Sequence, residues 1–261
     1  MADLNVYRKL YDLSGRVALV AGGAGGIGSA ICEGLAAFGA YVVVCSRTPA
    51  KNAEVAARIQ AVGGQAEARE LDITDVPGTR SLVAGVAREL GAIDVLVNCV
   101  GSHKEAPAMD YDESDWDRIV DLNLKYAFFL SQAVARVQVP NKRGKHIHIS
   151  SVRSLLGIRR GYISYCSSKG GMNLMVKQLA SEWAAHGITV NAIAPTFTRT
   201  ELVRKYLDDP EFYNPLIARI PLGRVCEPVD LAGLALYLAA PASDFITGQI
   251  IFADGGVTAC Q

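Results

Sequence analysis

Short apolar runs alternate with segments of helical spacing along the whole chain, and this rhythm limits the folds open to it. Most of the runs are continuous Val, Ile, Leu or Ala, as in strands that a parallel sheet buries on both faces. The repeated order predicts an α/β fold, a doubly wound parallel seven-stranded sheet flanked by helices on both faces. The predicted strands are 16–21, 41–45, 65–71, 93–98, 145–150, 188–193 and 249–253. The predicted helices are 26–38, 49–61, 76–90, 113–137, 164–186 and 228–239.

The 261 residues show no linker and no repeat, so we expect a single domain over residues 1–261. The rhythm breaks at 196–221, a long segment rich in charge, Tyr and Pro. This segment follows the carboxyl end of a predicted strand, which is where ligands bind in sheets of this kind. We predict that it is a mobile substrate lid, with an ordinary surface loop as the alternative.

A glycine-rich turn, 21–28, follows the first predicted strand and opens the first predicted helix. Glycines permit positive φ and let backbone N–H groups approach a phosphate at a helix N-terminus. The run matches both the GxGxxG and the GxxxGxG spacing. In a Rossmann sheet this turn binds the pyrophosphate of a dinucleotide. The residues expected to contact it are Gly22, Gly23, Gly25, Gly26, Ile27 and Gly28.

The end of the second predicted strand indicates which dinucleotide is preferred. An acid there binds a free ribose, whereas an Arg accommodates a 2′-phosphate. The chain has Ser46 and Arg47 at this place and no acid, so NADP(H) is preferred and NAD(H) is possible. A solvated Arg47 is the alternative. Asp72 and Ile73, after the third predicted strand, are expected beside the adenine, although Asp72 could also belong to a helix cap.

Tyr165 and Lys169 lie four positions apart, on one face of a predicted helix. The same stripe continues through Met172, Val176 and Leu179, so it should be buried. A phenol has a reference pKa of about 10, and an ammonium group beside it lowers that pKa. Proton transfer by such a phenol, next to a nucleotide-binding turn, indicates alcohol–carbonyl redox chemistry. The structural alternative is that Lys169 reaches solvent from the helix end.

Charge and composition exclude several other classes of protein. The formal net charge is zero, which argues against a nucleic-acid partner, and no apolar run is long enough to span a membrane. The N-terminus lacks a signal-peptide core and the six cysteines show no CxxC spacing, so a cytoplasmic protein with reduced thiols is expected. His146 and His148 face one side of a predicted strand, but no third ligand is evident and no metal is expected.

Together these residues resemble the short-chain dehydrogenase/reductase family from about residue 13 to residue 257. The family's NNAG motif corresponds to 98–101, its PG…T motif to 195–200 and its closing ITGQ…DGG motif to 246–256. The chain departs from the family's motifs at Ala21, Cys99, Val100 and Thr196. The resemblance implies cofactor contacts from Asn98, Gly101, Pro195, Phe197, Thr200, Tyr165 and Lys169. Thr200 could instead cap a lid helix beginning near residue 201.

The family's catalytic set corresponds to Asn123, Ser151, Tyr165 and Lys169. The resemblance implies that Tyr165 is the general acid in reduction and the general base in oxidation. It also implies that Lys169 lowers the phenol pKa and holds the nicotinamide ribose, and that Ser151 donates to the substrate oxygen. Asn123 would sustain a water relay to Lys169, or it could be a helix-packing amide.

We therefore expect an NAD(P)(H)-dependent oxidoreductase that interconverts a carbonyl and a secondary alcohol. The lid and the C-terminal region are similar to those of gluconate 5-dehydrogenase and related sugar or polyol reductases. This implies a small polar substrate, such as a sugar acid, a polyol or a keto compound. A 3-oxoacyl reductase and a non-catalytic dinucleotide-sensing protein on the same fold are the alternatives.

Two further expectations concern substrate charge and assembly. Cationic loop side chains around one pocket would favour an anionic or polyhydroxylated substrate, with solvated charges as the alternative. These side chains are His103, Lys104, Arg153, Arg159, Arg199 and Arg204. Apolar residues on more than one face of the two long helices predict a homo-oligomer, a dimer or a tetramer. They include Phe128, Phe129, Leu174 and Met175.

Overall fold

The computed structural model describes residues 4–260, apart from the side chains of Leu202 and Lys205. Over these residues, seven parallel strands form one sheet in the order β3-β2-β1-β4-β5-β6-β7. The strands are β1 (Val17–Ala21), β2 (Tyr41–Ser46), β3 (Gln65–Glu70), β4 (Val95–Asn98), β5 (Gly144–Ile149), β6 (Ile188–Pro195) and β7 (Ile250–Ala253). The order runs outward in both directions from the β1–β4 pair, which confirms the predicted doubly wound fold.

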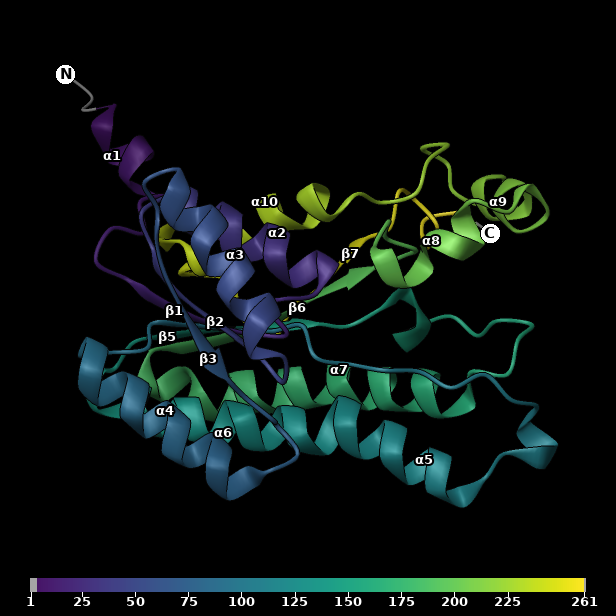
Figure 1. Cartoon of the computed structure of the whole chain (residues 1–261), viewed down its shortest axis with the longest axis horizontal. Helices are drawn as coiled ribbons and strands as arrows, with labels where there is room; N and C mark the ends of the chain where they lie inside the picture. Colours follow the sequence, from purple (N-terminus) through teal and green to yellow (C-terminus); the bar gives the residue numbers. More distant parts are fainter. Residues whose placement is uncertain (1–3, 261) are drawn as a thin grey trace.

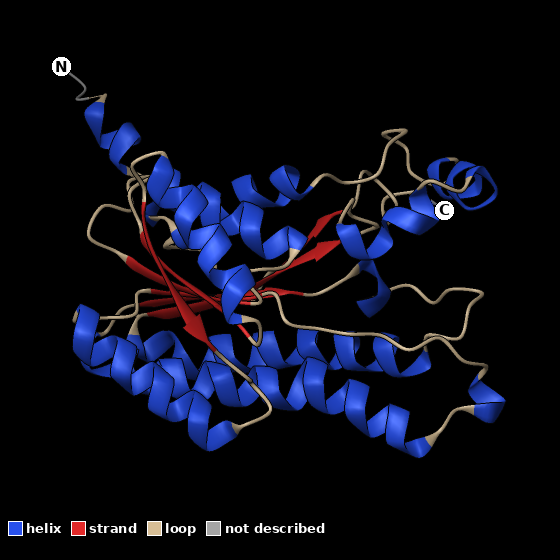
Figure 2. Cartoon of the chain, in the orientation of Figure 1, coloured by secondary structure: helices blue, strands red, loops and turns tan. Residues whose placement is uncertain are grey.

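Helices cover both faces of the sheet (Figure 1), and Figure 2 shows the strands enclosed between the two helical layers. Helices α2, α3 and α10 lie on one face, and α4, α6 and α7 lie on the other. The helices are α1 (Asn5–Lys9), α2 (Gly26–Ala37), α3 (Pro49–Ala61), α4 (Val76–Leu90), α5 (Glu113–Val120), α6 (Tyr126–Gln138), α7 (Ile163–Trp183), α8 (Glu201–Leu207), α9 (Pro210–Ile217) and α10 (Pro228–Ala239). None of the helices within residues 4–260 is long and apolar enough to cross a membrane.

The strand β1 shows why the sheet is buried on both faces. All its side chains are buried, and successive ones point to opposite faces. Ala18 and Val20 pack into the hydrophobic cluster beneath α2 and α10. Leu19 packs into the second cluster, which includes side chains of α4 and α6. Burying one such Val or Leu stabilises the fold by about 1.5–3 kcal/mol, so a continuous apolar run favours this central position.

The prediction of one helix over 113–137 is wrong in the middle. The segment forms α5, then a π-helical turn over Asp121–Lys125, then α6. The π turn contains Asn123, whose side chain bonds to the backbone of Ser102 on another segment. A π turn holds one residue more than an α turn, and the apolar spacing along the sequence does not reveal it.

The segment 196–221 contains two short helices, α8 and α9, beyond the carboxyl end of β6 (Figure 1). The ring of Phe212 on α9 contacts the rings of Phe197 and Tyr206, with centroid distances of 5.6 Å in both cases. These aromatic contacts hold the two helices against the chain that leaves β6.

Candidate active site

The glycine turn joins β1 to α2 at the carboxyl edge of the sheet. The N–H groups of Gly22 and Gly23 donate to Cys45 O on β2, at 2.7 and 3.1 Å, and that of Gly25 donates to Gly22 O at 3.0 Å. Gly22 has a φ of 78°, which favours glycine. These three glycines therefore shape the turn, and their N–H groups are already engaged.

The first turn of α2 provides the anion-binding groups. Its N-cap, Gly25, makes no side-chain cap, so the N–H groups of Gly26, Ile27 and Gly28 point out of the helix end. The helix dipole adds partial positive charge there. Gly28 packs so closely on the turn that a Cβ on it would lie 2.1 Å from Gly22 O. The donor set and this close backbone contact fit a dinucleotide pyrophosphate.

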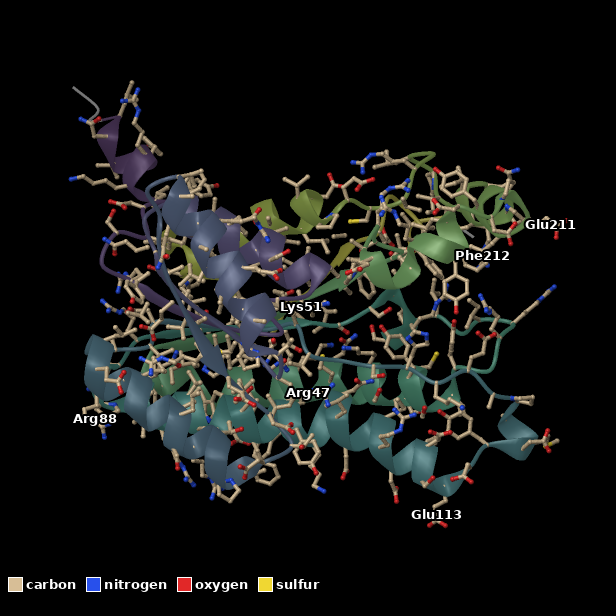
Figure 3. The ribbon with its side chains drawn as sticks, in the orientation of Figure 1. Arg47, Lys51, Arg88, Glu113, Glu211 and Phe212 are labelled. Carbon is tan, nitrogen blue, oxygen red and sulfur yellow. The ribbon has the colours of Figure 1, made fainter. Side chains whose placement is uncertain are left out.

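The residues predicted to select the 2′-phosphate lie at the end of β2. Ser46 Oγ donates to Asn52 Oδ1 at 2.5 Å, so its hydroxyl is tied to α3. Arg47 is exposed and makes no ion pair within residues 4–260. Figure 3 labels it together with Lys51, a second exposed cation in the first turn of α3. Both positive charges are available to a phosphate.

The residues predicted for the adenine follow β3. Asp72 accepts hydrogen bonds from the N–H and hydroxyl groups of Thr74, and these bonds lower the pKa of Asp72. The N-cap of α4 is Asp75, so the helix-cap alternative for the segment 72–75 is correct at Asp75 but not at Asp72. Ile73 is buried in the core and leaves only its backbone for a ligand.

A cavity of about 520 Å³ opens where the loops after β4, β5 and β6 meet α7, α8 and α9. The predicted residues that line it are Ile27, Gly101, Ser151, Tyr165, Lys169, Pro195, Phe197 and Thr200. The other predicted residues lie outside its walls; they are Gly22, Gly23, Gly25, Gly26, Gly28, Ser46, Arg47, Asp72, Ile73, Asn98 and Asn123. The predicted residues therefore fall into two groups. One group lines the cavity, and most of the other lies on the glycine turn and at the ends of β2 and β3.

Tyr165 and Ser151 both line the cavity, where the serine hydroxyl interacts with the phenol. Ser151 caps the short 3₁₀ turn after β5, and its Oγ accepts from the N–H group of Arg153 at 3.1 Å. The rings of His103 and Tyr162 pack edge-on to Tyr165, with centroids 6.1 and 6.4 Å away. These contacts fix the phenol beside the serine hydroxyl.

Lys169 is only 3% exposed, so the alternative that it reaches solvent is wrong. Its Nζ donates to Ile149 O at 2.7 Å and lies 5.8 Å from the centroid of the Tyr165 ring. Burial lowers the pKa of Lys169 to about 8. Burial also raises the pKa of Tyr165, and the Ser151 hydrogen bond only partly opposes this. The structure therefore differs from the expectation that Lys169 lowers the phenol pKa, because the ammonium bonds to the strand carbonyl.

Asn123 is buried in the π turn next to this site. Its Nδ2 donates to Ser102 O at 2.8 Å and to Ser168 Oγ at 3.0 Å, and its Oδ1 accepts from the Ser102 N–H group at 2.8 Å. A Cβ on Gly101 would lie 3.3 Å from Asn123 Oδ1 and 3.4 Å from Lys169 Nζ. The amide therefore ties the loop after β4 to α7, close to the lysine.

Asn98 and Thr200 border the glycine turn on two sides. Asn98 Oδ1 accepts from the Val100 N–H group at 3.0 Å, and its buried Nδ2 has no partner within the described residues. Thr200 is the N-cap of α8 but makes no side-chain cap. A Cβ on Gly26 would lie 2.8 Å from the Thr200 methyl group. The segment 196–221 therefore begins directly against the glycine turn.

His146 and His148 are buried in β5. Nε2 of His146 bonds to Gln138 Oε1 at 2.8 Å, and Nε2 of His148 bonds to Ser131 Oγ at 3.2 Å. Burial lowers the pKa of His146 to about 3 and that of His148 to about 4, so both are neutral at pH 7. No group of three or more metal-ligating side chains occurs in the part of the chain that is described.

Of the six cations expected around one pocket, only His103 and Arg153 line the cavity. Lys104 pairs with Asp115 at 3.5 Å and Arg199 with Glu227 at 2.9 Å, so both are surface ion pairs. Arg159 and Arg204 are exposed and outside the cavity walls. For these four residues the alternative of solvated loop charges is correct.

The side chains of the cavity wall that sequence reasoning did not name include Arg160, Tyr162 and Phe212. Arg160 makes two hydrogen bonds of 2.6 Å to the carboxylate of Glu105, and its guanidinium lies 5.6 Å from the Tyr162 ring centre and 5.5 Å from that of Phe212. Phe212 is labelled on α9 in Figure 3. Tyr162 precedes Tyr165 by three residues, a spacing that could have indicated it. Arg160 lies in a loop, which has no such periodicity, and Phe212 lies on the short helix α9, so neither gave a signal.

The chain is similar to several known proteins over nearly its whole length. Residues 22–258 match the family model described as enoyl-(acyl carrier protein) reductase. The chain is 37% identical to a gluconate 5-dehydrogenase of Gluconobacter oxydans over 95% of its own length and 97% of that protein. It is 35% identical to a 5-keto-D-gluconate 5-reductase of Escherichia coli with the same coverage. A crystal structure of a Burkholderia cenocepacia gluconate 5-dehydrogenase, in complex with NADP and tartrate, matches with a TM-score of 0.92, 36% identity and coverage of 97% and 99%.

Proposed function

Because the chain belongs to the short-chain dehydrogenase/reductase family, we propose that it acts on the hydroxyl or keto group of a small sugar acid with NADP(H). It is an NAD(P)-dependent oxidoreductase of alcohol and carbonyl groups. One observation carries the proposal. A single cavity holds Ser151, Tyr165 and Lys169, adjoins the glycine turn through Ile27 and Thr200, and has basic but no acidic side chains among its described lining residues.

The similar proteins support a sugar acid as substrate. Two of them are named for gluconate or 5-keto-D-gluconate, and the Burkholderia structure holds tartrate, a small hydroxy acid. A cavity of about 520 Å³ is of the size that suits a small ligand, since such sites span roughly 300–1,000 Å³.

The dinucleotide would lie along the turn and the β2 end. Its pyrophosphate would accept from the N–H groups of Gly26, Ile27 and Gly28. Its 2′-phosphate would bind Arg47 and Lys51, and the end of β2 carries no acid that would favour a free ribose. When bound, the nicotinamide ring supplies or takes up the hydride. NADP in the Burkholderia structure supports this assignment.

The proton comes from this chain's own residues. In reduction, the Tyr165 hydroxyl gives its proton to the substrate carbonyl oxygen, while the Ser151 hydroxyl donates a hydrogen bond to the same oxygen. The raised pKa of Tyr165 keeps the phenol protonated near neutral pH, as a general acid requires. Lys169, with a pKa of about 8, is mostly charged there and would hold the nicotinamide ribose. Asn123 holds the loop beside Lys169 in place.

We also propose that the segment 196–221 acts as a lid. Val203 and Tyr206 of α8 and Phe212 of α9 line the cavity beyond the carboxyl end of β6. Closing these apolar side chains over a bound substrate would exclude water from the reacting bond. The cysteines of the chain are free thiols, which suits the reducing cytoplasm that we propose as its location and that cell fractionation would test.

Self-association through α6 and α7 is proposed from their outer faces. Leu174 is 69% exposed on α7, and Phe128, Phe129 and Met175 are only partly buried nearby. Apolar side chains gathered in this way mark an interaction surface. We expect the purified protein to sediment as a dimer or tetramer at micromolar concentration. We expect Leu174→Glu to dissociate it, and a wild-type monomer would contradict the proposal.

The proposed activity is tested by following the nicotinamide absorbance with purified protein. We expect NADPH to be oxidised with 5-keto-D-gluconate, and NADP⁺ to be reduced with gluconate, faster than the NADH and NAD⁺ reactions. An acetoacetyl thioester and a neutral aromatic ketone are included as substrates of other reductase classes. Faster turnover of the thioester would favour the 3-oxoacyl reductase alternative. Dinucleotide binding without turnover of any carbonyl would favour the sensing protein.

Arg47→Ala serves as the control for the dinucleotide assignment. Loss of one exposed charged hydrogen bond to the 2′-phosphate should raise the KM for NADPH about tenfold and leave that for NADH unchanged. Arg88→Ala is the matched control, since Arg88 is an exposed arginine at the far end of α4. Equal effects of the two substitutions on the KM for NADPH would remove the basis for preferring NADP(H).

A further inference from the structure

Arg153 is placed to meet a ligand inside the cavity. It follows Ser151 by two residues in the 3₁₀ turn after β5, and it is partly buried in the cavity wall. Its Nη1 donates to Gly157 O at 2.9 Å, which fixes the direction of the side chain. The guanidinium makes no other hydrogen bond and no ion pair within residues 4–260. A guanidinium has five N–H donors in a planar fork, so most of them remain free.

Each of the other basic side chains of the cavity is paired with an acid, belongs to the proton-transfer site or is mostly neutral. Arg160 is paired with Glu105 through two hydrogen bonds. Lys169 donates to Ile149 O and belongs to the proton-transfer site. Burial lowers the pKa of His103 below its usual 6.5, so this ring is mostly neutral at pH 7. Arg153 is therefore the cation of the described cavity lining that neither pairs with an acid nor belongs to the proton-transfer site.

A second guanidinium strengthens the positive potential at this place. Arg219 follows α9, is exposed, and makes no ion pair within the described residues. Burial lowers the pKa of Arg153, and the positive charge of Arg219 lowers it further. Two unpaired like charges repel each other, and an anion bound between them relieves this repulsion.

We propose that Arg153, assisted by Arg219, binds the carboxylate of the substrate and makes the enzyme selective for anionic over neutral polyhydroxy ketones. This inference rests on the proposed function, because it assigns the group that recognises the acid end of that substrate. A carboxylate accepts two parallel N–H bonds from a guanidinium. The backbone N–H group of Arg153 donates to Ser151 Oγ, so the turn that would hold the carboxylate also holds the serine of the reacting end.

Binding and turnover are measured separately. The NADP⁺-loaded protein is titrated with tartrate by calorimetry, and kcat/KM is measured with 5-keto-D-gluconate and with L-sorbose, which carries CH₂OH in place of the carboxylate. Arg153→Gln is expected to weaken tartrate binding and to lower kcat/KM for 5-keto-D-gluconate by about 10- to 100-fold, with L-sorbose changed less than threefold. Arg153→Lys keeps the charge without the fork and should fall between. Arg219→Gln is expected to weaken tartrate binding and lower kcat/KM for 5-keto-D-gluconate less than Arg153→Gln does.

Arg159→Gln is the matched control, because Arg159 is an exposed arginine six residues further along, outside the cavity walls. It should leave tartrate binding and kcat/KM unchanged. An unaltered Kd for NADP⁺ shows that each variant is folded. Wild-type tartrate binding that Arg153→Gln abolishes would support the inference even if 5-keto-D-gluconate is not turned over. The inference is overturned if Arg153→Gln binds tartrate as tightly as the wild type, if it loses sorbose and ketogluconate activity equally, or if the wild type binds no tartrate.

Discussion

Tyr165→Phe protein should bind NADP(H) as tightly as the wild type and turn over its substrate at about a thousandth of the rate, since a positioned general acid contributes roughly 10²–10⁴-fold. The substitution removes only the hydroxyl that interacts with Ser151. The ring keeps its edge-on contacts with His103 and Tyr162, so the folded structure should not change. The effect should appear in kcat, because the proton is transferred in the transition state and not on binding.

Tyr162→Phe provides the comparison for this result. This substitution removes the same phenol oxygen from a residue that precedes Tyr165 by three positions and lines the same cavity. Its hydroxyl interacts with Glu105 rather than with Ser151. We expect kcat to fall less than tenfold, because no proton of the reaction passes through it. A Tyr165→Phe protein that keeps more than a tenth of wild-type kcat, or a Tyr162→Phe protein that loses as much, would show that another group protonates the substrate.

The sheet could be predicted from the sequence because its physical cause is local. A strand such as β1 is a continuous apolar run, and only burial on both faces makes that run favourable. The glycine turn ends the run and starts α2 within the same few residues. The π turn at Asn123 could not be predicted in this way. Its hydrogen bonds go to Ser102, on a different segment, so its cause lies in tertiary structure.

The same distinction between local and tertiary causes applies to the candidate site. Tyr165, Lys169 and Ser151 could be identified because helix and strand geometry fixes where they lie relative to one another. The sequence could not show that Lys169 Nζ bonds to the carbonyl of Ile149, which changes the expected effect on the phenol pKa.

The cationic loop residues show most clearly what could not be predicted from the sequence. Arg159 and Arg160 are adjacent in the sequence, yet Arg160 lines the cavity and Arg159 does not. No periodicity governs a loop, so the choice between them depends on the ion pair of Arg160 with Glu105.

Gly28→Ala should both destabilise the protein and remove its dinucleotide affinity. The added Cβ would lie 2.1 Å from Gly22 O and 2.9 Å from Gly23 Cα. Since backbone atoms cannot move aside as a flexible side chain does, the turn or the first turn of α2 must shift. Overpacking of this kind costs about 3 kcal/mol. The shift also misplaces N–H groups that donate to the pyrophosphate, so the Kd for NADP⁺ should rise at least about 100-fold.

The matched control is Gly233→Ala on α10. It makes the same chemical change inside a helix, at an exposed position where a Cβ would meet no atom within 4 Å. Alanine is the better helix former, so this variant should be up to about 1 kcal/mol more stable and bind NADP⁺ normally. Denaturant unfolding and dinucleotide titration measure both effects. Normal NADP⁺ affinity in Gly28→Ala would mean that the pyrophosphate lies elsewhere, because the close approach of Gly28 to Gly22 and the free N–H groups of α2 belong to one small turn and cannot be altered separately.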